Sequence, residues 1–496
     1  MPRWRAAVVL SLCVAPCAAQ EPGAVGAPLK RFEEALTAVI AKAERSVVAI
    51  RRYARVDPRR NVQAGNRIFL GAGGQADPLR QFRIANEAAP TGFGAGVVVG
   101  PGLVLTQYLA IGIDERHTVT TVDGETFEAE LIAADPRSSL AALRVASNDP
   151  AAERAFNAPA AALGRAEDLV KGRFVVAIGN PLAIESDGQP TASLGVVTNT
   201  ARRAPLGERF LRSAEDAEGP PRTTLHHQGA LIQTDAKLGW NSAGGALVTL
   251  DGELVGVLTT AAAIVGHEAP AGYAIPINRA MRRVARALLE GREPEYGLLG
   301  IRFQATPPGV TNGVMISDVY AAGPAGRSGL RKQDVVAKVN GESVVDAASL
   351  QLLVGSLAPG DEPTISYLRN GREQTTTVRL GKAYVDGPKV ATSRQPSWQG
   401  LRVDFPTAVP PLVLQAKVQE RRLDPEGCVV VSEVEPKSVA WKMGIRPYVY
   451  ISHVDSERVS TPQEFYAAVK AAPGTARLKF TKPLTAAPRQ PTPRQL

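Results

Sequence analysis

The sequence predicts a mainly β protein with several domains. Glycine (46) and proline (38) are frequent among the 496 residues, and aromatic residues make up only 5% of them. Such a composition favours short strands joined by many turns. Runs rich in Val, Ile and Thr recur between residues 92 and 259, separated by turn signals such as Asp123-Gly124 and Asp251-Gly252. This spacing is typical of β-barrels or a β-sandwich.

Each expected element follows from the local pattern of apolar residues. Helical spacing covers Leu29 to Lys42 and returns at Asn278 to Glu290. The segment 53–91 is punctuated by Gly and Pro and is typical of a long loop. The expected strands are Ser46–Ile50, Val97–Val99, Thr118–Val122, Glu125–Ala133, Leu140–Val145, Phe174–Ile178, Gly195–Thr198, Ala246–Leu250 and Glu253–Thr259.

The N-terminus has the pattern of a secretory signal. Arg3 and Arg5 precede an apolar run, and small residues follow up to Ala19. We therefore expect a signal peptide at 1–19 and an exported protein, periplasmic or extracellular. Lipoprotein anchoring through Cys17 is not expected, because the proline directly before it fits lipidation poorly. Beyond the leader only Cys428 remains, so no intramolecular disulfide is expected.

Charge and ligand spacing exclude some classes of function. The chain carries 57 Lys and Arg against 48 Asp and Glu, a formal net charge of +9. Its densest basic cluster, at residues 51–60, lies in the loop-like segment, which favours a solvated loop over a nucleic-acid surface. No set of His, Cys, Asp and Glu shows metal-ligand spacing. We therefore expect no nucleic-acid partner, no metal and no cofactor.

The C-terminal part contains an internal repeat. Ile316–Val319 matches Val431–Val434, and Ser328–Arg331 falls opposite Met443–Arg446, at a constant offset of 115 residues (316 to 431, 328 to 443). Two copies of one module are therefore expected after the front domain. The expected boundaries are a front domain at 20–290, modules at 297–383 and 397–483, and a disordered tail at 484–496.

Two strings resemble the nucleophile region of the HtrA/Deg-type serine proteases. They are Gln233–Ala236 and Gly244-Gly245, and the Asp251-Gly252 hairpin follows them. Similar strings occur in the order of that family at Gly94–Gly96, Leu105-Thr106, Gly179–Pro181 and Gly272–Pro276. The resemblance covers residues 30 to 483. It implies a trypsin-like double β-barrel followed by two PDZ domains, and a homo-oligomer, since trimers are common in the family.

The resemblance fails at the catalytic residues. Such a protease needs a Ser nucleophile, a His base, an Asp that orients the His, and backbone donors for the oxyanion. By the family pattern, Leu109 occupies the His slot, Ser139 the Asp slot and Ala243 the Ser slot. Ser242 lies one residue before the nucleophile slot, and Asn241 replaces the glycine of the oxyanion loop. No residue is therefore expected to be catalytic.

The five histidines offer no evident replacement for the missing base. His117 is expected to face solvent or to cap a strand. His226 and His227 precede the Gln233 segment, and as adjacent strand residues at most one of them is expected to face the cleft. His267 lies in a loop and His453 in the second module. Isolated structural histidines are the expectation.

The repeated modules predict peptide binding. Leu298, Leu299, Gly300 and Ile301 match the loop and strand opening with which PDZ domains hold a peptide C-terminus. The equivalent residues of the second copy are Gly400, Leu401, Arg402 and Val403. There Gln399 interrupts the apolar lining and Val449 stands opposite Asp334, so ligand binding by the second module stays open.

The sequence thus predicts an exported HtrA-like pseudoprotease. We expect it to bind peptide C-termini or unfolded envelope proteins as a scaffold, adaptor or holdase. One alternative is an active HtrA-like serine endopeptidase of envelope quality control, which requires a His within reach of Ser242. Another is a regulatory subunit that assembles with an active HtrA-type protease.

Overall fold

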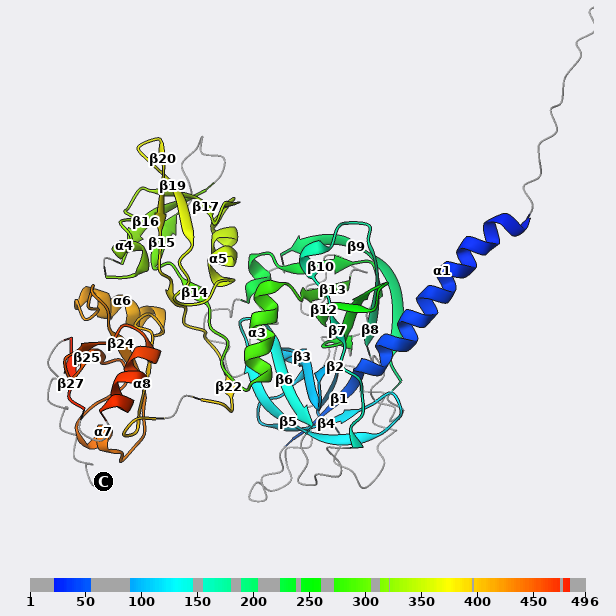
Figure 1. Cartoon of the computed structure of the whole chain (residues 1–496), viewed down its shortest axis with the longest axis horizontal. Coiled ribbons are helices and arrows are strands. Elements are labelled where there is room, and N and C mark those ends of the chain that lie inside the picture. The colour runs from blue at the N-terminus through cyan, green and yellow to red at the C-terminus, as the bar shows by residue number, and fades with distance from the viewer. Residues whose placement is uncertain are drawn as a thin grey trace, which may run out of the picture.

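The computed structural model shows two β-barrels followed by two small modules (Figure 1). It describes residues 22–54, 90–145, 155–179, 189–203, 224–237, 242–259, 272–304, 313–320, 322–394, 397–472 and 476–481. Several expectations concern residues outside the described ranges: the signal peptide, the interior of the 53–91 loop, Asn241, His267 and the tail. Of the 53–91 loop, only residues 53–54 and 90–91 are described.

The first barrel is closed by six strands. They are β1 (Val47–Ala54), β2 (Gly92–Gly100), β3 (Leu103–Gln107), β4 (Glu115–Thr120), β5 (Thr126–Asp135) and β6 (Leu140–Val145). Their order is β5-β4-β1-β2-β3-β6, and β5 also pairs with β6. Alternate residues such as Val48, Ile50 and Val98 point inward and are fully buried. A further short strand, β22 (Val390–Ala391), joins the outer edge of β5 from much later in the chain.

The second barrel repeats this plan. Its strands are β8 (Phe174–Gly179), β9 (Thr191–Arg202), β10 (Leu231–Thr234), β11 (Ala246–Thr249), β12 (Glu253–Thr259) and β13 (Gly272–Pro276), and β7 (Ala162–Leu163) pairs alongside β12. The order β11-β8-β9-β10-β13-β12 closes because β11 also pairs with β12. The strand runs expected from the sequence are thereby strands of two closed barrels, not of a sandwich.

Two helices belong to the barrels. The helix α1 (Pro22–Ala43) extends away from them at its N-terminal end, and α3 (Arg279–Leu289) packs against β5 and β6 (Figure 1). The Asn278 side chain accepts a hydrogen bond from the Met281 N–H and caps α3. The α3 face carrying Met281, Val284 and Leu288 is buried. Both helical predictions are therefore met by helices of slightly different length.

The two modules share a core order of elements (two strands, a short helix, two strands, a longer helix and a strand), to which the first adds β14, β20 and β21 and the second adds α6. The first contains β14 (Gly297–Leu298), β15 (Ile301–Gln304), β16 (Val314–Val319), α4 (Pro324–Arg327), β17 (Val335–Val339), β18 (Glu342–Ser343), α5 (Ala347–Gly355), β19 (Thr364–Arg369), β20 (Arg372–Thr377) and β21 (Gly381–Lys382). The second contains β23 (Leu401–Asp404), α6 (Pro411–Gln419), β24 (Val429–Val434), α7 (Val439–Lys442), β25 (Tyr450–Val454), β26 (Glu457–Arg458), α8 (Pro462–Ala471) and β27 (Leu478–Phe480). The repeat seen in the sequence is therefore structural.

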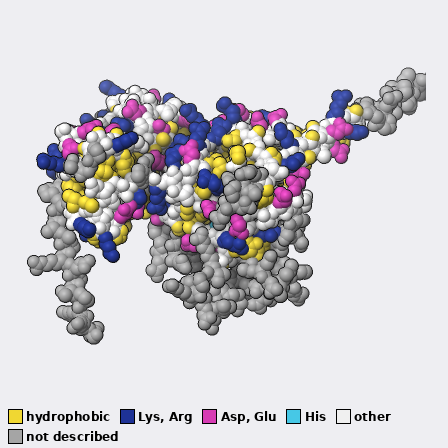
Figure 2. Space-filling model, turned by 60° about the horizontal axis from the view of Figure 1, so that its bottom comes forward, with side chains coloured by type: hydrophobic (Ala, Val, Ile, Leu, Met, Phe, Trp, Pro, Cys, Tyr) yellow, Lys and Arg dark blue, Asp and Glu magenta, His cyan; other side chains and the backbone are white. Residues whose placement is uncertain are grey.

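The surface of the described residues mixes both signs of charge. On the face shown in Figure 2, Lys and Arg side chains are interspersed with Asp and Glu. Among the described residues, no helix is both long and apolar enough to cross a membrane.

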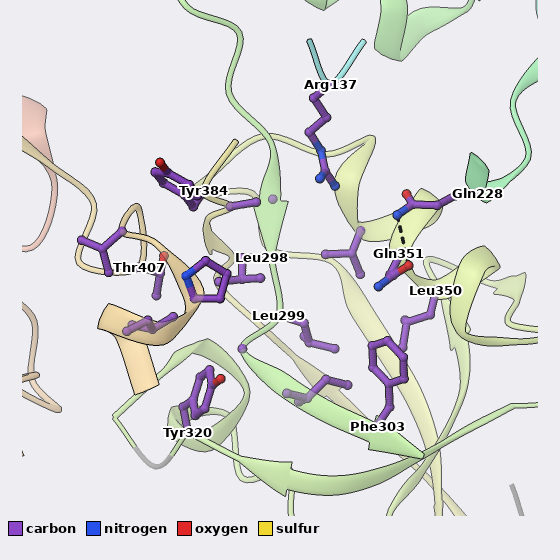
Figure 3. A pocket seen from close by; sticks show the side chains of 18 residues that line it. Arg137, Gln228, Leu298, Leu299, Phe303, Tyr320, Leu350, Gln351, Tyr384 and Thr407 are labelled. Atoms are coloured by element: carbon purple, nitrogen blue, oxygen red, sulfur yellow. Dashed lines mark hydrogen bonds between the residues drawn. The ribbon is translucent and has the colours of Figure 1, made fainter. Parts of the chain in front are cut away.

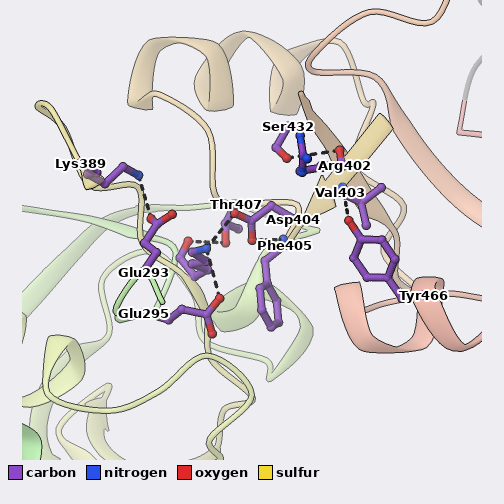
Figure 4. A network of polar contacts seen from close by, with 11 residues as sticks. Glu293, Glu295, Lys389, Arg402, Val403, Asp404, Phe405, Thr407, Ser432 and Tyr466 are labelled. Carbon is purple, nitrogen blue, oxygen red and sulfur yellow. Dashed lines mark hydrogen bonds and ion pairs between the residues drawn. The ribbon is translucent and has the colours of Figure 1, made fainter. Parts of the chain in front are cut away.

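A buried lysine joins the two modules. The Lys382 ammonium lies 2.8 Å from the Asp404 carboxylate of the second module and 3.1 Å from Glu295, which precedes the first module (Figure 4). Burial alone would lower the pKa of Lys382, but the carboxylates of Asp404, Glu293 and Glu295 raise it, so the lysine is charged. The Thr407 hydroxyl adds a hydrogen bond to the Lys382 carbonyl.

We expect Lys382→Met to lower the free energy of unfolding by about 2–3 kcal/mol, because it leaves the partly buried carboxylates of Asp404 and Glu295 without the cation that they share. Urea denaturation followed by tryptophan fluorescence measures this, since Trp398 and Trp441 lie in the second module. The matched control is Lys338→Met, which removes an exposed ion pair with Glu373 and should cost less than about 1 kcal/mol. Equal effects of the two substitutions would contradict the role given to Lys382.

Candidate functional site

The structure brings the expected His and Asp slots side by side. Leu109 lies in the short 3-10 helix η3 (Tyr108–Ala110), directly after β3. The Tyr108 N–H donates a hydrogen bond of 2.8 Å to the carbonyl of Ser139, in the turn between β5 and β6. Ser139 is buried and has a positive φ of 60°. Leu109 is 44% exposed, so an apolar side chain faces solvent at this position.

The backbone of Ala243 and the helix η3 both lie against Gly94. The Ala243 carbonyl accepts a 2.8 Å hydrogen bond from the Ala95 N–H. A methyl group placed on Gly94 would lie 2.7 Å from Cβ of Ala110 and 3.3 Å from the Ala243 oxygen. Gly94 therefore allows η3 and the 242–245 loop to approach each other. The three positions Leu109, Ser139 and Ala243 surround one place between the barrels.

Ser242 lies against the end of β8. It is buried, and a methyl group placed on Gly179 would lie 3.0 Å from its hydroxyl oxygen, so the side chain packs against the end of β8. Among the described residues, no histidine forms a hydrogen bond with Ser242. Gly244 has a φ of +91°, and any Cβ there would overlap the Ala95 carbonyl, which fixes the shape of the loop. Asn241 lies outside the described residues.

Two expectations about histidines are wrong. His117 is buried, because its strand β4 is paired on both sides, with β1 through Arg52 and with β5 through Ala129. His226 and His227 lie in a short 3-10 helix, η5 (Leu225–Gln228), and not on a strand. Thr224 caps η5, and its N–H donates a 2.9 Å hydrogen bond to Nδ1 of His227.

His226 supports the turn that carries Ser139. Its Nε2–H donates a 2.8 Å hydrogen bond to the Ser138 carbonyl, and the side chain is buried. The Leu225 N–H likewise donates to the Arg137 carbonyl at 2.9 Å. Burial lowers the pKa of His226 to about 4 despite the hydrogen bond to Ser138. The imidazole is therefore neutral at pH 7 and holds the turn in place.

A buried polar cluster lies beneath this turn. The Asp135 carboxyl accepts hydrogen bonds from the Tyr296 hydroxyl at 2.5 Å and from the Ser138 N–H at 2.7 Å. Burial raises the pKa of Asp135 although both hydrogen bonds lower it. The Arg137 guanidinium lies over the Tyr296 ring, 5.1 Å from its centroid. Sequence reasoning missed this cluster, because Tyr296 is 161 positions from Asp135.

The first module contains an open groove of about 330 Å³ between β15 and α5 (Figure 3). All four peptide-binding residues expected there, Leu298, Leu299, Gly300 and Ile301, line it. The carbonyls of Leu299 and Gly300 accept hydrogen bonds from Ala325 and Tyr320 and so hold the loop. Lining residues that sequence reasoning missed are Phe303 and Tyr320, Leu350 and Val354 on α5, Leu414 on α6, and Arg137 and Gln228 from the barrels.

The equivalent loop of the second module is closed on itself. The Leu401 N–H donates to the Trp398 carbonyl and the Trp398 N–H donates to the Leu401 carbonyl, both at 2.9 Å. On β23, the Val403 N–H donates to the Tyr466 hydroxyl of α8 (Figure 4). The Trp398 ring packs edge to face on Phe465, also of α8. The Leu401 N–H and the Val403 N–H, which a peptide strand would use, therefore already have partners within the module: a backbone carbonyl for Leu401 and a side-chain hydroxyl for Val403.

Sequence comparison agrees with this architecture. The family model described as trypsin-like peptidase domain matches residues 94–257, and the PDZ domain model matches residues 297–380. The chain has the domain order of an HtrA/DegP-type trypsin-like protease with a PDZ domain. The predicted fold class is confirmed: a mainly β, trypsin-like domain of two closed six-stranded barrels precedes PDZ-type modules.

Curated relatives are named as proteases of this type. The chain is 27% identical over 390 residues to a probable periplasmic serine endoprotease DegP-like of Pseudomonas fulva (strain 12-X), covering 77% of this chain and 74% of the relative. It is 29% identical over 380 residues to the protein of the same name of Halomonas elongata, covering 75% and 72%. Among solved structures, the HtrA-type protease AlgW with decapeptide is 24% identical with a TM-score of 0.47, covering 71% of this chain and 98% of that chain.

The buried His226 predicts a loss of stability in acid. Its folded pKa of about 4 lies below the ordinary histidine pKa of 6.5, so the unfolded chain binds a proton between these pH values that the folded chain does not. The free energy of unfolding should be highest above pH 6.5 and fall by about 3 kcal/mol as the pH drops to 4. Urea denaturation across this pH range measures the slope.

The His226→Asn variant should lose this part of the pH dependence, whatever its stability at pH 7. The matched control is His453→Asn on β25, which should reduce the slope less, because burial lowers the pKa of His453 too but its side chain is only partly buried. An unchanged slope in His226→Asn would show that other groups cause the acid sensitivity.

Proposed function

We propose that this chain is an exported, non-proteolytic relative of HtrA/DegP-type proteases that binds peptide C-termini in its first PDZ module. The observation that carries the proposal is the leucine at position 109, beside Ser139 and Ala243, where the family pattern expects the catalytic base. A leucine side chain accepts no proton, so a serine hydroxyl nearby is not activated for attack.

The residues around Leu109 support the same conclusion. Ser139 carries no negative charge with which to stabilise an imidazolium, and Ala243 carries no nucleophile. Ser242 is the nearest hydroxyl in sequence, but it is buried against Gly179. The barrels would then serve as a scaffold that carries the PDZ groove. The alternative, an active serine endopeptidase, is favoured by the names of the relatives and is separated by the assay below.

The proposed location is the periplasm. The relatives from Pseudomonas fulva and Halomonas elongata are named periplasmic, and the leader pattern at 1–19 fits export. The proposed ligands are therefore C-termini of envelope proteins or exposed segments of unfolded ones, bound by a scaffold, adaptor or holdase. Assembly as a trimer, or as a regulatory subunit with an active HtrA-type protease, stays a prediction from the family resemblance.

The purified chain should neither cleave unfolded casein nor react with a fluorophosphonate probe, because no base activates a serine. Active trypsin in the same assay serves as the positive control, and Ser242→Ala should behave like the unchanged chain. Cleavage or labelling that disappears in Ser242→Ala would overturn the non-proteolytic assignment.

Peptide binding should depend on the first groove. We expect Phe303→Ser to weaken binding at least about fivefold, because Phe303 supplies apolar wall area to the groove and is 36% exposed, so its loss should spare the fold. The probe is the strongest binder from a synthetic array of decapeptides with free C-termini and varied apolar last residues. Fluorescence anisotropy with the full chain measures its affinity.

The control for this measurement is Leu412→Ser. Leu412 is 82% exposed on α6, beside the groove but not among its lining residues. It should leave the affinity unchanged. If the full chain binds no member of the array, or if Phe303→Ser has no effect, the groove is not the peptide site.

A further inference from the structure

Arg137 reaches the PDZ groove from the first barrel. It follows β5 in the same turn as Ser139, yet its side chain lines the groove of the first module together with Leu299 and Val354 (Figure 3). The Gln228 side chain, also from the barrel domain, donates a 3.0 Å hydrogen bond to Gln351 on α5. The groove is thus walled partly by another domain, and Arg137 is the cation in that wall.

Among the described residues, Arg137 has no hydrogen-bond or ion-pair partner, and its guanidinium contacts only the face of the Tyr296 ring, 5.1 Å from the centroid. Its Nε atom is buried without a hydrogen-bond partner among the described residues. Asp135 acts on it only through the electric field, because the hydrogen bonds to that carboxyl come from Tyr296 and Ser138. A largely buried guanidinium without a paired carboxylate is costly, so it indicates an anionic ligand that completes the site.

Arg283 provides a contrast within the same interface. It also comes from the barrel domain, on α3, and its guanidinium donates to the backbone carbonyls of Glu295, Ser356 and Leu357 around the first module. Through these hydrogen bonds Arg283 connects the barrel domain to the first module. No such set of bonds accounts for Arg137.

Arg137 lies at the end of the groove where the C-terminus of a bound peptide is expected. A methyl group on Gly355, at the C-terminal end of α5, would lie 3.1 Å from Nη2 of Arg137. The carbonyl of the neighbouring Val354 lies 2.7 Å from the Cβ position of Gly297, where the Leu298–Ile301 loop begins. Arg137 and the loop therefore lie at the same end of α5, and backbone loops of this kind capture terminal carboxylates.

We propose that Arg137 is the cationic anchor for the terminal carboxylate of the peptide bound in the first PDZ module. The inference rests on the proposed function, because it names the group that recognises the ligand end. The site is then composite: the first module supplies the loop and the apolar walls, and the barrel supplies the charge. A guanidinium pairs well with a carboxylate, since it offers two parallel N–H donors.

The test compares the array-selected decapeptide with the same peptide bearing a C-terminal amide. The full chain should bind the free acid on the order of tenfold more tightly than the amide. Arg137→Gln should weaken the free acid about tenfold and leave the amide within about twofold, so that the preference disappears. Arg137→Lys, which keeps the charge but not the paired donors, should keep an intermediate preference.

The control is Arg283→Gln, which loosens the domain junction without removing the anchor and should change the affinities for acid and amide by the same factor. An equal loss of both affinities in Arg137→Gln would reduce Arg137 to a structural residue and overturn the inference. So would a full chain that binds acid and amide equally, although peptide binding itself would stand. Absence of binding to any array peptide would instead remove the proposed function.

Discussion

The hydrogen bond between Tyr296 and Asp135 determines where the first module sits. Asp135 ends a strand of the first barrel, and Tyr296 directly precedes β14 of the module. Both side chains are buried, and burial raises the pKa of each, while the hydrogen bonds that Asp135 accepts lower its own pKa. Removing one partner would leave a buried polar group unsatisfied, at a cost of about 1–3 kcal/mol.

The Tyr296–Asp135 hydrogen bond positions the other contacts between the barrel domain and the first module. With Tyr296 in place, Arg137 lies over its ring and η5 lies against α5, where Gln228 meets Gln351. The turn between β5 and β6 thus forms part of one wall of the PDZ groove through Arg137. The side chain of Ser139, in the same turn, does not line the groove.

Much of the fold was predictable from local patterns, and the junction was not. Strands such as Phe174–Gly179 and Glu253–Thr259 are recognisable because each is a short apolar run bounded by turns. The loop of the first PDZ module was recognisable because its residues are consecutive. Arg137 was not, because nothing near it in sequence says that a module more than 150 residues later packs on it.

The errors on histidines have physical causes of the same kind. His117 is expected from the sequence to face solvent or to cap a strand, but it is buried on a strand that has neighbours on both sides in the barrel. His226 and His227 precede β10, which favours a strand at their positions, but they lie in η5. Thr224, three positions before His227, was the available signal of a helix start, since its hydroxyl caps the turn.

The strand β22 has a consequence for how the molecule can move. It consists of two residues, Val390 and Ala391, which pair with Ala134 and Ala133, and nearby the Tyr108 hydroxyl donates to the Pro388 carbonyl. The segment is held by more than this pairing, because the Thr392 N–H donates to the Ile132 carbonyl, the Ser393 N–H donates to the Gly291 carbonyl, and Lys389 pairs with Glu293. Residues 388–393 therefore run along the barrel domain, which shortens the free span before the second module and restricts how far that module can move from the first.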